Sequence, residues 1–427
     1  NTMKKKLFCL AMLFLILPSC FVLGACSAKK EETRITAPGT DTDYLYTEPD
    51  TTPTSALQDT ACPEPETTAP VRGVWEGEDK TISFLACGDN IIYYGNVRDA
   101  TAKSADGTLD FAYSYEPIAD MIANADIAFI NQETLMAGDG YAYSYYPCFN
   151  SPQEVGLTLV NLGFDIVNIA NNHMLDKGGD GLHATIEFWR SQPVLLLGDY
   201  LSEEETSQID IYEYEGLKIA FVSYTYGTNG ITLPAGRSEV IPYHSKELIT
   251  RQMALARSQA DLIIASCHWG DENTFYPNAM QKEYAQLLCD EGADVIIGHH
   301  PHVIQPITWL ENADGHRTLC VYSLGNLMAE MAGQYNMLGG ILQFEIDLQH
   351  GKTPQIISPV FVPSVFYFNT SFYNNTIYLL QDFTDDLASS HGIRYYGNSL
   401  SLPSIYAKLR ELISEEYLPF GFDANRY

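Results

Sequence analysis

The chain has 427 residues, and its 54 acidic side chains outnumber its 24 basic ones, for a formal net charge of −30 at pH 7. The length suits one large domain with accessory segments rather than one small domain. The negative charge repels nucleic acid and anionic surfaces, so nucleic-acid binding is excluded, and an acidic polymer would need a local basic or metal site.

The first 25 residues have the pattern of an export signal. Lys4 to Lys6 form a basic start, and an apolar run from Leu7 to Leu17 follows. The stretch Leu23-Gly24-Ala25-Cys26 resembles the bacterial lipobox, which implies cleavage before Cys26 and lipidation of its thiol. The expected location is the outer face of the cell membrane, held by lipid. A transmembrane helix is the alternative, although the apolar run is short.

Residues 26–79 are rich in Thr, Pro, Glu and Asp and poor in aliphatic side chains. Such a composition cannot bury enough apolar surface to fold. We expect a disordered, extended tether between the membrane and a folded domain.

From residue 80 onward, apolar runs bounded by turn residues alternate with amphipathic segments. Predicted strands cover 81–88, 126–131, 165–170, 194–197, 209–214, 217–224, 261–267, 294–298, 304–310, 319–323 and 340–348. Predicted helices cover 115–124, 152–162, 179–190, 245–259 and 278–290. The sequence therefore predicts an α/β domain over 80–380, with two packed sheets flanked by helices, and a peripheral segment of helix and loop over 381–427.

Five of the predicted strands end in side chains of the types that commonly bind metals. These side chains are Asp89 with Asn90, Glu133 with Asn131, Asn172 with His173, His268, and the group His299, His300 and His302. Strand ends meet at one edge of an open α/β sheet, so these groups are expected to converge. Imidazole, carboxylate and amide donors together favour one or two divalent ions such as Mn, Zn or Fe. A histidine-rich surface turn after a core strand is the alternative for residues 299–302.

Two ions would need a bridging carboxylate, and Glu133 is the candidate. His173 is the candidate general acid for a leaving group, with Asp176 supporting it or shaping its loop. Asn171 and Asn172 have a second interpretation, because Asn often caps turns.

Six sequence blocks, in order, resemble the CapA or PgsA family of poly-γ-glutamate capsule proteins, which is similar to the calcineurin-like metallophosphoesterases. They are G-D-N-I-I-Y-Y-G from Gly88, N-Q-E-T from Asn131, A-N-N-H-M-L-D-K-G from Ala170, H-W-G-D-E from His268, G-H-H-P-H-V from Gly298 and Y-S-L-G-N from Tyr322. The resemblance covers about residues 81–330.

The resemblance implies a four-layer α/β/β/α sandwich. It places Asp89, Glu133, Asn172, His268, His300 and His302 at metal positions and His173 at the general acid, with His299 as an alternative first imidazole. Metallophosphoesterases usually have D-x-H on the first strand, but here Asn90 and Ile91 follow Asp89. A second ion would then be held more weakly, or by Asn90 or Asn131. Asn326 is expected to line the site, although a strand-to-loop turn explains its block equally well.

The function that this resemblance implies is biosynthesis or export of an anionic capsular polymer of the poly-γ-glutamate type, together with membrane subunits of a synthase or export complex. One alternative is an active metal-dependent hydrolase acting on phosphoesters or amide bonds of envelope polymers. The other is a metal-stabilised polymer-binding module without turnover.

Overall fold

The computed structural model describes residues 73–104 and 107–427. The predicted signal segment, Cys26 and most of the predicted tether lie outside the described residues. The sequence predicts that residues 73–79 belong to the tether, but the structure shows that they pack on the domain. The backbone N–H of Trp75 donates to the carbonyl of Lys352 at 2.8 Å, so the ordered domain begins before residue 80.

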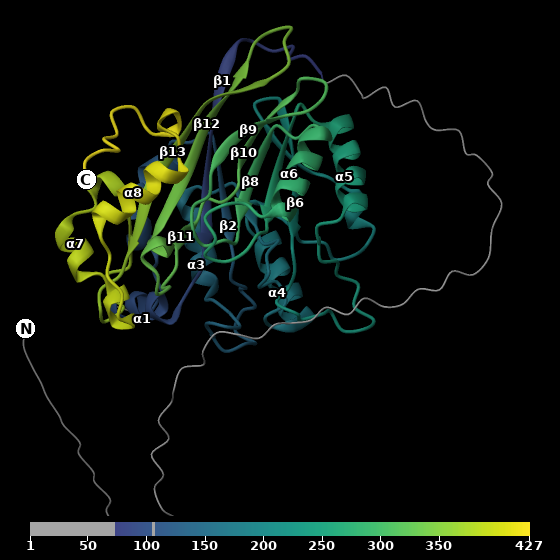
Figure 1. Cartoon of the computed structure of the whole chain (residues 1–427). Helices are drawn as coiled ribbons and strands as arrows, with labels where there is room; N and C mark the ends of the chain where they lie inside the picture. Colours follow the sequence, from purple (N-terminus) through teal and green to yellow (C-terminus); the bar gives the residue numbers. More distant parts are fainter. Residues whose placement is uncertain (1–72, 105–106) are drawn as a thin grey trace, which may run out of the picture. The chain divides into compact units, whose positions relative to one another are not determined.

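The first sheet has eight strands and mixes parallel and antiparallel pairing (Figure 1). Its order is β14 (Thr376–Leu379), β13 (Gln355–Tyr367), β12 (Leu338–Leu348), β1 (Lys80–Asn90), β2 (Ile127–Gln132), β3 (Ile166–Asn168) and β4 (Leu195–Leu197), and β11 (Asn326–Met328) also pairs with β1. Strands β1 to β4 are parallel, as expected for strands joined by helices. Their carboxyl ends therefore lie at one edge of the sheet.

The second sheet has six strands. Its order is β5 (Asp210–Tyr214), β6 (Leu217–Thr225), β7 (Leu262–His268), β8 (Val295–His299), β10 (Arg317–Val321) and β9 (Ile307–Glu311). Strands β6, β7, β8 and β10 are parallel, and β5 and β9 close the two edges in antiparallel pairs. All seven residues of β7 are buried, which is typical of a parallel strand that is covered on both faces.

Alternate side chains of the second sheet enter two different cores. Ile219 and Phe221 of β6 join the larger core between the sheets, whereas Ala220 and Val222 join a smaller core. The helices α5 (Lys246–Gln259) and α6 (Ala279–Asp290) cover that smaller core (Figure 1). This period of two places helices on one face and the first sheet on the other.

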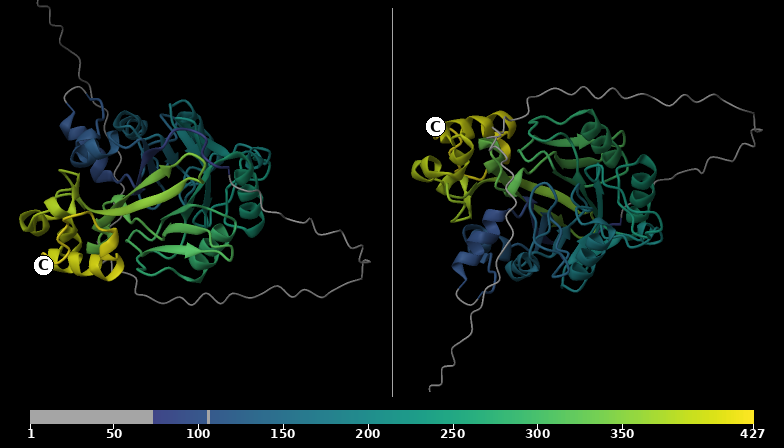
Figure 2. Two further views of the ribbon diagram at one scale, coloured as in Figure 1. Left: turned by 90° about the horizontal axis from the view of Figure 1, so that it is seen from above. Right: turned by 90° about the horizontal axis from the view of Figure 1, so that it is seen from below.

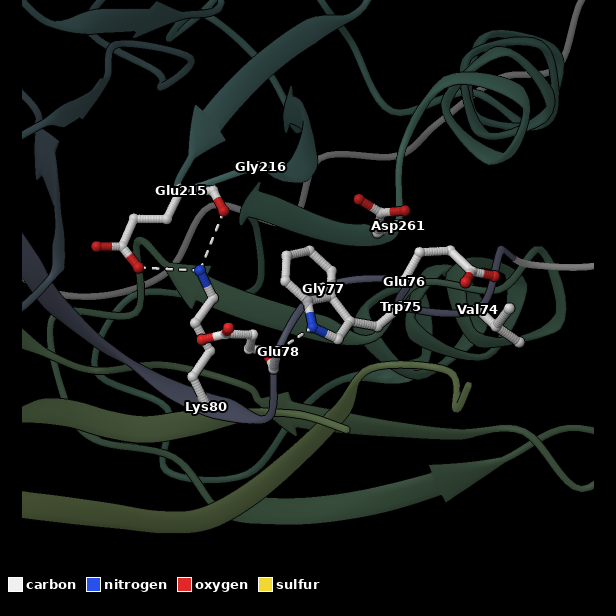
Figure 3. A pocket seen from close by; sticks show the side chains of 9 residues that line it. All are labelled: Val74, Trp75, Glu76, Gly77, Glu78, Lys80, Glu215, Gly216 and Asp261. Carbon is white, nitrogen blue, oxygen red and sulfur yellow. Dashed lines mark hydrogen bonds and ion pairs between the residues drawn. The ribbon is translucent and has the colours of Figure 1, made fainter. Parts of the chain in front are cut away.

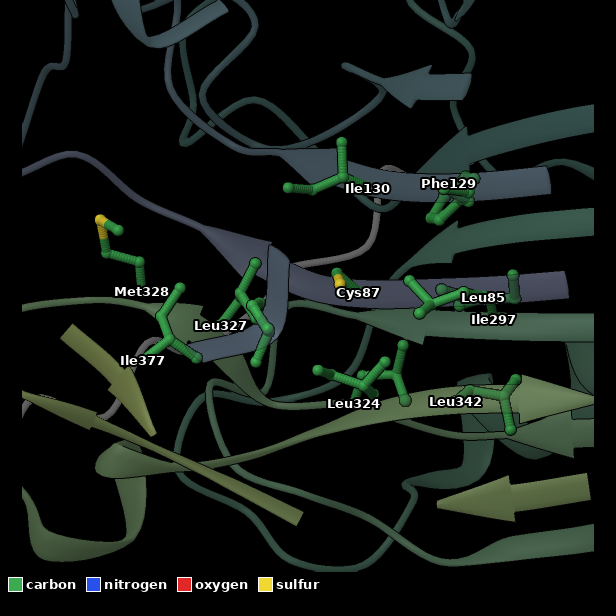
Figure 4. Packing of buried hydrophobic residues seen from close by; sticks show 14 of the residues in the cluster. Leu85, Cys87, Phe129, Ile130, Ile297, Leu324, Leu327, Met328, Leu342 and Ile377 are labelled. Carbon is green, nitrogen blue, oxygen red and sulfur yellow. The ribbon is translucent and has the colours of Figure 1, made fainter. Parts of the chain in front are cut away.

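The core between the sheets is aromatic and aliphatic (Figure 4). Phe84 of β1 stacks on Phe344 of β12 with ring centroids 4.8 Å apart, and it reaches Phe221 of the other sheet at 6.4 Å. Such aromatic pairs contribute about 0.5–1.5 kcal/mol beyond the area that they bury. This packing fixes the separation of the two sheets and so the distance between the strand ends that they carry.

The remaining helices are α1 (Tyr94–Lys103), α2 (Ala112–Ala123), α3 (Gln153–Leu162), α4 (Gly178–Arg190), α7 (Asp385–Ser390) and α8 (Leu402–Leu412). Of these, α2 contacts β14 and α4 contacts β4 of the first sheet, which completes the predicted four-layer α/β/β/α sandwich. The segment 381–427, yellow in Figure 2, packs beside β13. Its Ile405 and Leu409 join the larger core. No described helix is long and apolar enough to span a bilayer.

Candidate metal centre

The strand registers bring the predicted side chains together from both sheets. In the first sheet Asp89 is the register partner of Asn131 on β2 and of Asn326 on β11. In the second sheet His268 and His299 are partners at the ends of β7 and β8. The expected convergence of the strand ends is therefore observed.

Two glycines allow the strand ends to approach one another. Gly88 lies at a register shift of β1, and a Cβ there would overlap the carbonyl oxygen of Gly325. A Cβ on Gly298 would overlap the carbonyl of Tyr322. Both positions therefore require glycine, and each directly precedes a candidate ligand.

Glu133 lies at the centre of the site. Its Oε1 atom is 3.7 Å from Nε2 of His268, 3.7 Å from Nε2 of His302 and 4.0 Å from Nε2 of His173. These distances are too long for hydrogen bonds, and both carboxylate oxygens are buried without a hydrogen-bond partner among the described residues. Burial raises the pKa of Glu133 well above its usual value, opposed by His302 and reinforced by Asp89.

Three groups of side chains place donor atoms within 4.8 Å of one another: Glu133 with His268 and His300, Asp89 with Glu133 and His302, and Glu272 with His300 and His302. Glu133 belongs to the first two groups, as a bridging carboxylate would.

Asp89 faces the imidazoles of the second sheet. Its Oδ1 atom is 3.4 Å from Nδ1 of His299, and its Oδ2 atom is 3.3 Å from Nδ1 of His302 and accepts from the His300 N–H at 3.2 Å. Burial alone would raise the pKa of Asp89, but His299 and His302 hold it well below its usual value. The two imidazoles therefore favour the ionised form of Asp89.

Asn131 orients Asp89 rather than extending the donor set. Its Nδ2 donates to Oδ1 of Asp89 at 2.8 Å, and its Oδ1 accepts from Nδ2 of Asn168 at 2.7 Å. Asn168 lies at the end of β3, and its Oδ1 accepts from the Ala170 N–H. Both amide atoms of Asn131 are thus engaged.

Asn90 points away from the site. Its Nδ2 donates to Oε1 of Gln132 at 2.7 Å, and its Oδ1 accepts from the Tyr115 hydroxyl at 2.8 Å. The expectation that Asn90 could replace the missing ligand is corrected, because its side chain is committed to this separate network.

His300 and His302 have left-handed backbone conformations, with φ of 95° and 55°. Such conformations are costly for residues other than glycine and cluster at functional sites. Burial and then His302 lower the pKa of His300 to about 3, whereas Glu133 and Asp89 overcome burial and raise the pKa of His302 to about 9. The Oδ1 atom of Asn326 lies 3.0 Å from Nδ1 of His302, so Asn326 lines the site.

His299 and His300 occupy different surroundings. The His299 ring stacks on Phe129 of β2 at 5.8 Å, between the sheets, and contacts the Asp89 side of the site. His300 groups with Glu133 and His268. The geometry therefore favours His300 as the imidazole of the donor set.

His268 and Asn172 present adjacent donor atoms, with Nε2 and Oδ1 3.0 Å apart. The Asn172 amide nitrogen donates to Asn229, which fixes the oxygen toward His268. Burial and then His300 lower the pKa of His268 well below its usual value, so this imidazole is neutral. A neutral imidazole has the lone pair that a metal requires.

His173 is held by a carboxylate. Its Nδ1 lies 2.7 Å from Oδ2 of Asp176, and its Nε2 faces Glu133. Asp176 also accepts from the Phe149 N–H at 2.6 Å, so it supports His173, as the sequence indicated. Asn171 accepts from the His173 N–H at 2.9 Å and so has the turn-capping role of its second interpretation.

Glu272 also lines a pocket of 600 Å³ beside the site. Its other lining residues are Tyr93, Tyr94, Gly95, Tyr145, Tyr146, Glu330, Met331, Ala332, Phe372 and Tyr396. A pocket of 680 Å³ lies instead at the amino ends of β1, β6 and β7, where Lys80 pairs with Glu215 beside Trp75 (Figure 3). No histidine lines that second pocket, so the chemistry belongs at the carboxyl ends.

The donors fit a divalent metal. The Glu133 carboxylate is buried among imidazole nitrogens, and none of the described residues gives either of its oxygens a hydrogen bond. A buried polar group without a partner is unusual, and a bound metal ion would supply one. Nitrogen and oxygen donors in this mixture suit Mn, Zn or Fe. The supporting hydrogen bonds around the donors are also present, since Asn131 fixes Asp89 and Asn326 contacts His302.

Sequence reasoning missed three residues of the site. Asn168 completes the amide chain to Asp89, and the Tyr226 ring lies 4.5 Å from the His300 ring. Glu272 lies in the H-W-G-D-E segment, in which only His268 is predicted as a ligand. Asn168 is itself a polar residue at the end of a predicted strand, which is the same signal that identified the others.

The fold and site define a two-sheet α/β sandwich with a candidate divalent-metal centre at its strand ends. A family model described as "Bacterial capsule synthesis protein PGA_cap" matches residues 83–331, which is more than half of the chain. The chain therefore belongs to this capsule synthesis family.

Two curated relatives support this membership. "PGA biosynthesis protein CapA" of Bacillus subtilis (strain 168) is 30% identical over 190 residues, which are 44% of this chain and 48% of that protein. "Capsule biosynthesis protein CapA" of Bacillus anthracis is 25% identical over 201 residues, or 46% and 48% of the two chains. The chain thus spans about half the length of the curated relatives it matches.

Among solved structures, the NAD nucleotidase of Haemophilus influenzae aligns over 78% of this chain and 60% of its own, with 13% identity and a TM-score of 0.42. The 5'-nucleotidase precursor of Thermus thermophilus aligns over 78% and 58%, with 14% identity and the same TM-score.

Proposed function

We propose that this chain is a lipid-anchored cell-surface protein that acts in the biosynthesis or export of an anionic capsular polymer of the poly-γ-glutamate type. Family membership and the names of the Bacillus relatives support this proposal. The lipobox-like stretch before Cys26 supports the anchor. Membrane subunits of a synthase or export complex would be its partners.

The observation that carries the proposal is the convergence of Asp89, Glu133, His268, His300 and His302 on one point at the strand ends. The protein has a formal charge of −30, so a polyanion needs a local attraction to approach it. These residues would hold a divalent ion. When bound, the ion would polarise a phosphoryl or carbonyl oxygen of the polymer.

A second candidate function is hydrolysis, and the His173–Asp176 pair favours it. The Asp176 carboxylate accepts the proton on Nδ1 of His173 and leaves Nε2 facing the centre. In its doubly protonated form, His173 can donate the Nε2 proton to a leaving group. Phe149 packs edge-on against this ring at 4.8 Å, which restricts the imidazole and the water around it.

Turnover and binding assays on the metal-loaded full chain test these proposals. We would measure poly-γ-glutamate binding, cleavage of poly-γ-glutamate and cleavage of a phosphodiester for the wild type, His302→Ala and His173→Ala. The capsule proposal predicts polymer binding that His302→Ala weakens at least about tenfold, because the metal is lost. Binding that is absent, or unchanged in His302→Ala, would contradict it.

Turnover distinguishes a hydrolase from a binding module. Cleavage that His173→Ala reduces by about 10²–10⁴-fold, with metal retained, identifies a hydrolase. Binding without any cleavage identifies a module. The exposed residue His350 supplies the matched control, His350→Ala, which should behave as the wild type.

A further inference from the structure

Glu272 lies in the loop between β7 and α6, four residues after His268. One of its carboxylate oxygens lies within 4.8 Å of a nitrogen of His300 and of His302. Glu272 is exposed, whereas both histidines are buried. Its position beside the centre therefore needs a separate explanation.

The loop that carries Glu272 is tied to the histidine segment. The Asn273 N–H donates to the carbonyl of Pro301 at 2.8 Å, between the two histidines. Asn273 has φ of 60°, and its side-chain oxygen accepts from Asn336 at 2.7 Å. Gln305 donates to the Thr274 carbonyl at 2.7 Å. These bonds place the Glu272 backbone beside the centre even though its side chain is exposed.

The donor count leaves room for one more ligand. Two ions bridged by Glu133 would have His268 with His300 on one side and Asp89 with His302 on the other. A lone pair on an imidazole nitrogen serves one ion, so the Asp89 side would have three donors, and the His268 side would have three, or four with the Asn172 amide oxygen beside His268. Four donors are usual for zinc and about six for manganese.

Charge compensation favours the same conclusion. Two divalent ions carry four positive charges, and Asp89 and Glu133 supply two negative ones in a buried setting. Uncompensated buried charge is costly, and a third carboxylate reduces it. Glu272 is the third acidic side chain within reach of the histidine nitrogens.

Glu272 also lines the 600 Å³ pocket that contains Tyr93 and Tyr145. It therefore stands at the boundary between the buried donors and the space from which a ligand would approach. A carboxylate at this boundary can bind an ion while remaining open to solvent on its other side.

We propose that Glu272 is a metal ligand that closes the centre on its pocket side, with His300 and His302, and that this third carboxylate shifts the preference of the centre toward Mn²⁺ relative to Zn²⁺. Oxygen donors favour manganese more than zinc, because zinc gains more from nitrogen and sulfur. This inference rests on the metal centre of the proposed function.

Calorimetric titration of the metal-free full chain with Mn²⁺ and with Zn²⁺ tests it. Glu272→Ala should weaken Mn²⁺ binding at least about tenfold and Zn²⁺ binding by a smaller factor. The adjacent Asp271→Ala is the matched control, since Asp271 is also exposed but accepts from Asn278 at 2.9 Å instead. The control should bind both ions as the wild type does. Thermal unfolding of the metal-free proteins checks that all three are equally folded.

Four results would overturn the inference. The first is a Glu272→Ala protein whose affinity for Mn²⁺ is within about twofold of the wild type. The second is a loss of Mn²⁺ affinity in Asp271→Ala as large as that in Glu272→Ala, which would indicate a general effect of negative charge. The third is a Glu272→Ala protein that loses as much affinity for Zn²⁺ as for Mn²⁺, which would contradict the proposed preference for Mn²⁺. If the wild type bound neither ion, the metal centre and this inference would both fail, whereas the first three results leave the centre intact.

Discussion

Asn131 donates its amide N–H to Oδ1 of Asp89 at 2.8 Å across the β1–β2 register, and Asn168 in turn donates to Asn131 at 2.7 Å. The chain of amides therefore has a fixed direction that ends on the Asp89 carboxylate. Its role is to hold one carboxylate orientation toward the histidines of the other sheet.

Replacing Asn131 by Asp should disrupt this orientation. The substitution removes the donor and places a second carboxylate against Asp89, so the free energy of unfolding should fall by about 1–3 kcal/mol. Chemical denaturation of the metal-free protein measures this. The control is the exposed residue Asn425, and Asn425→Asp should change stability by less than about 0.5 kcal/mol. Equal effects of the two variants would refute the role of the amide chain.

Gly88→Ala should be strongly destabilising. The added methyl group would overlap the Gly325 carbonyl, so β1 would have to move away from β11, and we expect a loss of roughly 2–4 kcal/mol. The Ala variant of Gly140, where a Cβ meets nothing within 4 Å, is the control. Thermal and denaturant unfolding should show that Gly88→Ala is less stable than the control variant. A Gly88→Ala protein as stable as the control would show that β1 can move away from β11 at little cost.

His268→Ala and His302→Ala should each lose bound metal. Because a ligand that binds only the folded state stabilises it, the metal-loaded variants should unfold at a lower temperature than the metal-loaded wild type. Elemental analysis and thermal unfolding in excess metal and in chelator measure both effects. Full metal occupancy in either variant would contradict its assignment as a ligand.

Glu330 should make stability depend on pH. Burial raises its pKa to about 8, and its Oε1 has no hydrogen-bond partner among the described residues. The folded state therefore holds this proton more tightly than the unfolded chain, whose Glu pKa is about 4.3. This contribution to stability is complete below about pH 4 and is lost as the pH rises toward 8.

Glu330→Gln should remove that pH dependence. Between pH 5 and pH 9, the free energy of unfolding of the wild type should fall by up to about 4 kcal/mol relative to that of the variant, since one pKa unit corresponds to about 1.4 kcal/mol. Denaturant unfolding across this range gives the difference. Parallel stability curves for the two proteins would show that Glu330 titrates normally, and exposed Glu416→Gln should give a curve parallel to the wild type.

Much of the site could be predicted because its signal is local. An apolar run such as Leu262–Cys267 predicts a buried strand, and a histidine directly after it is placed at the strand end by chain geometry alone. The same reasoning applies to Asp89 and to His299–His302. Parallel pairing then brings these ends to one edge, which is why distant segments meet.

Other features have no such signal. Strand β13 contains Pro359 and Pro363, which usually argue against a strand, so its apolar run does not predict one. Strands β11 and β14 have three and four residues, too few to show a period of two. Helix α1 has a weakly amphipathic sequence and was also missed.

Two site details depend on tertiary contacts. Glu272 is exposed and lies in a loop, so its proximity to the histidines depends on tertiary contacts such as the bond from Asn273 to Pro301. Asn90 looked equivalent to Asp89 in the sequence, but successive residues of a strand point to opposite faces, and Tyr115 and Gln132 engage it there.

Metal titration of Glu133→Gln beside the wild type tests the central claim most directly, because this change keeps the shape of the side chain and removes its charge. The wild-type full chain should bind one or two divalent ions, and the variant should bind at least about tenfold more weakly while its metal-free form stays folded. Equal metal stoichiometry and affinity in the two proteins, or no binding in the wild type, would show that the converging strand ends do not form a metal centre.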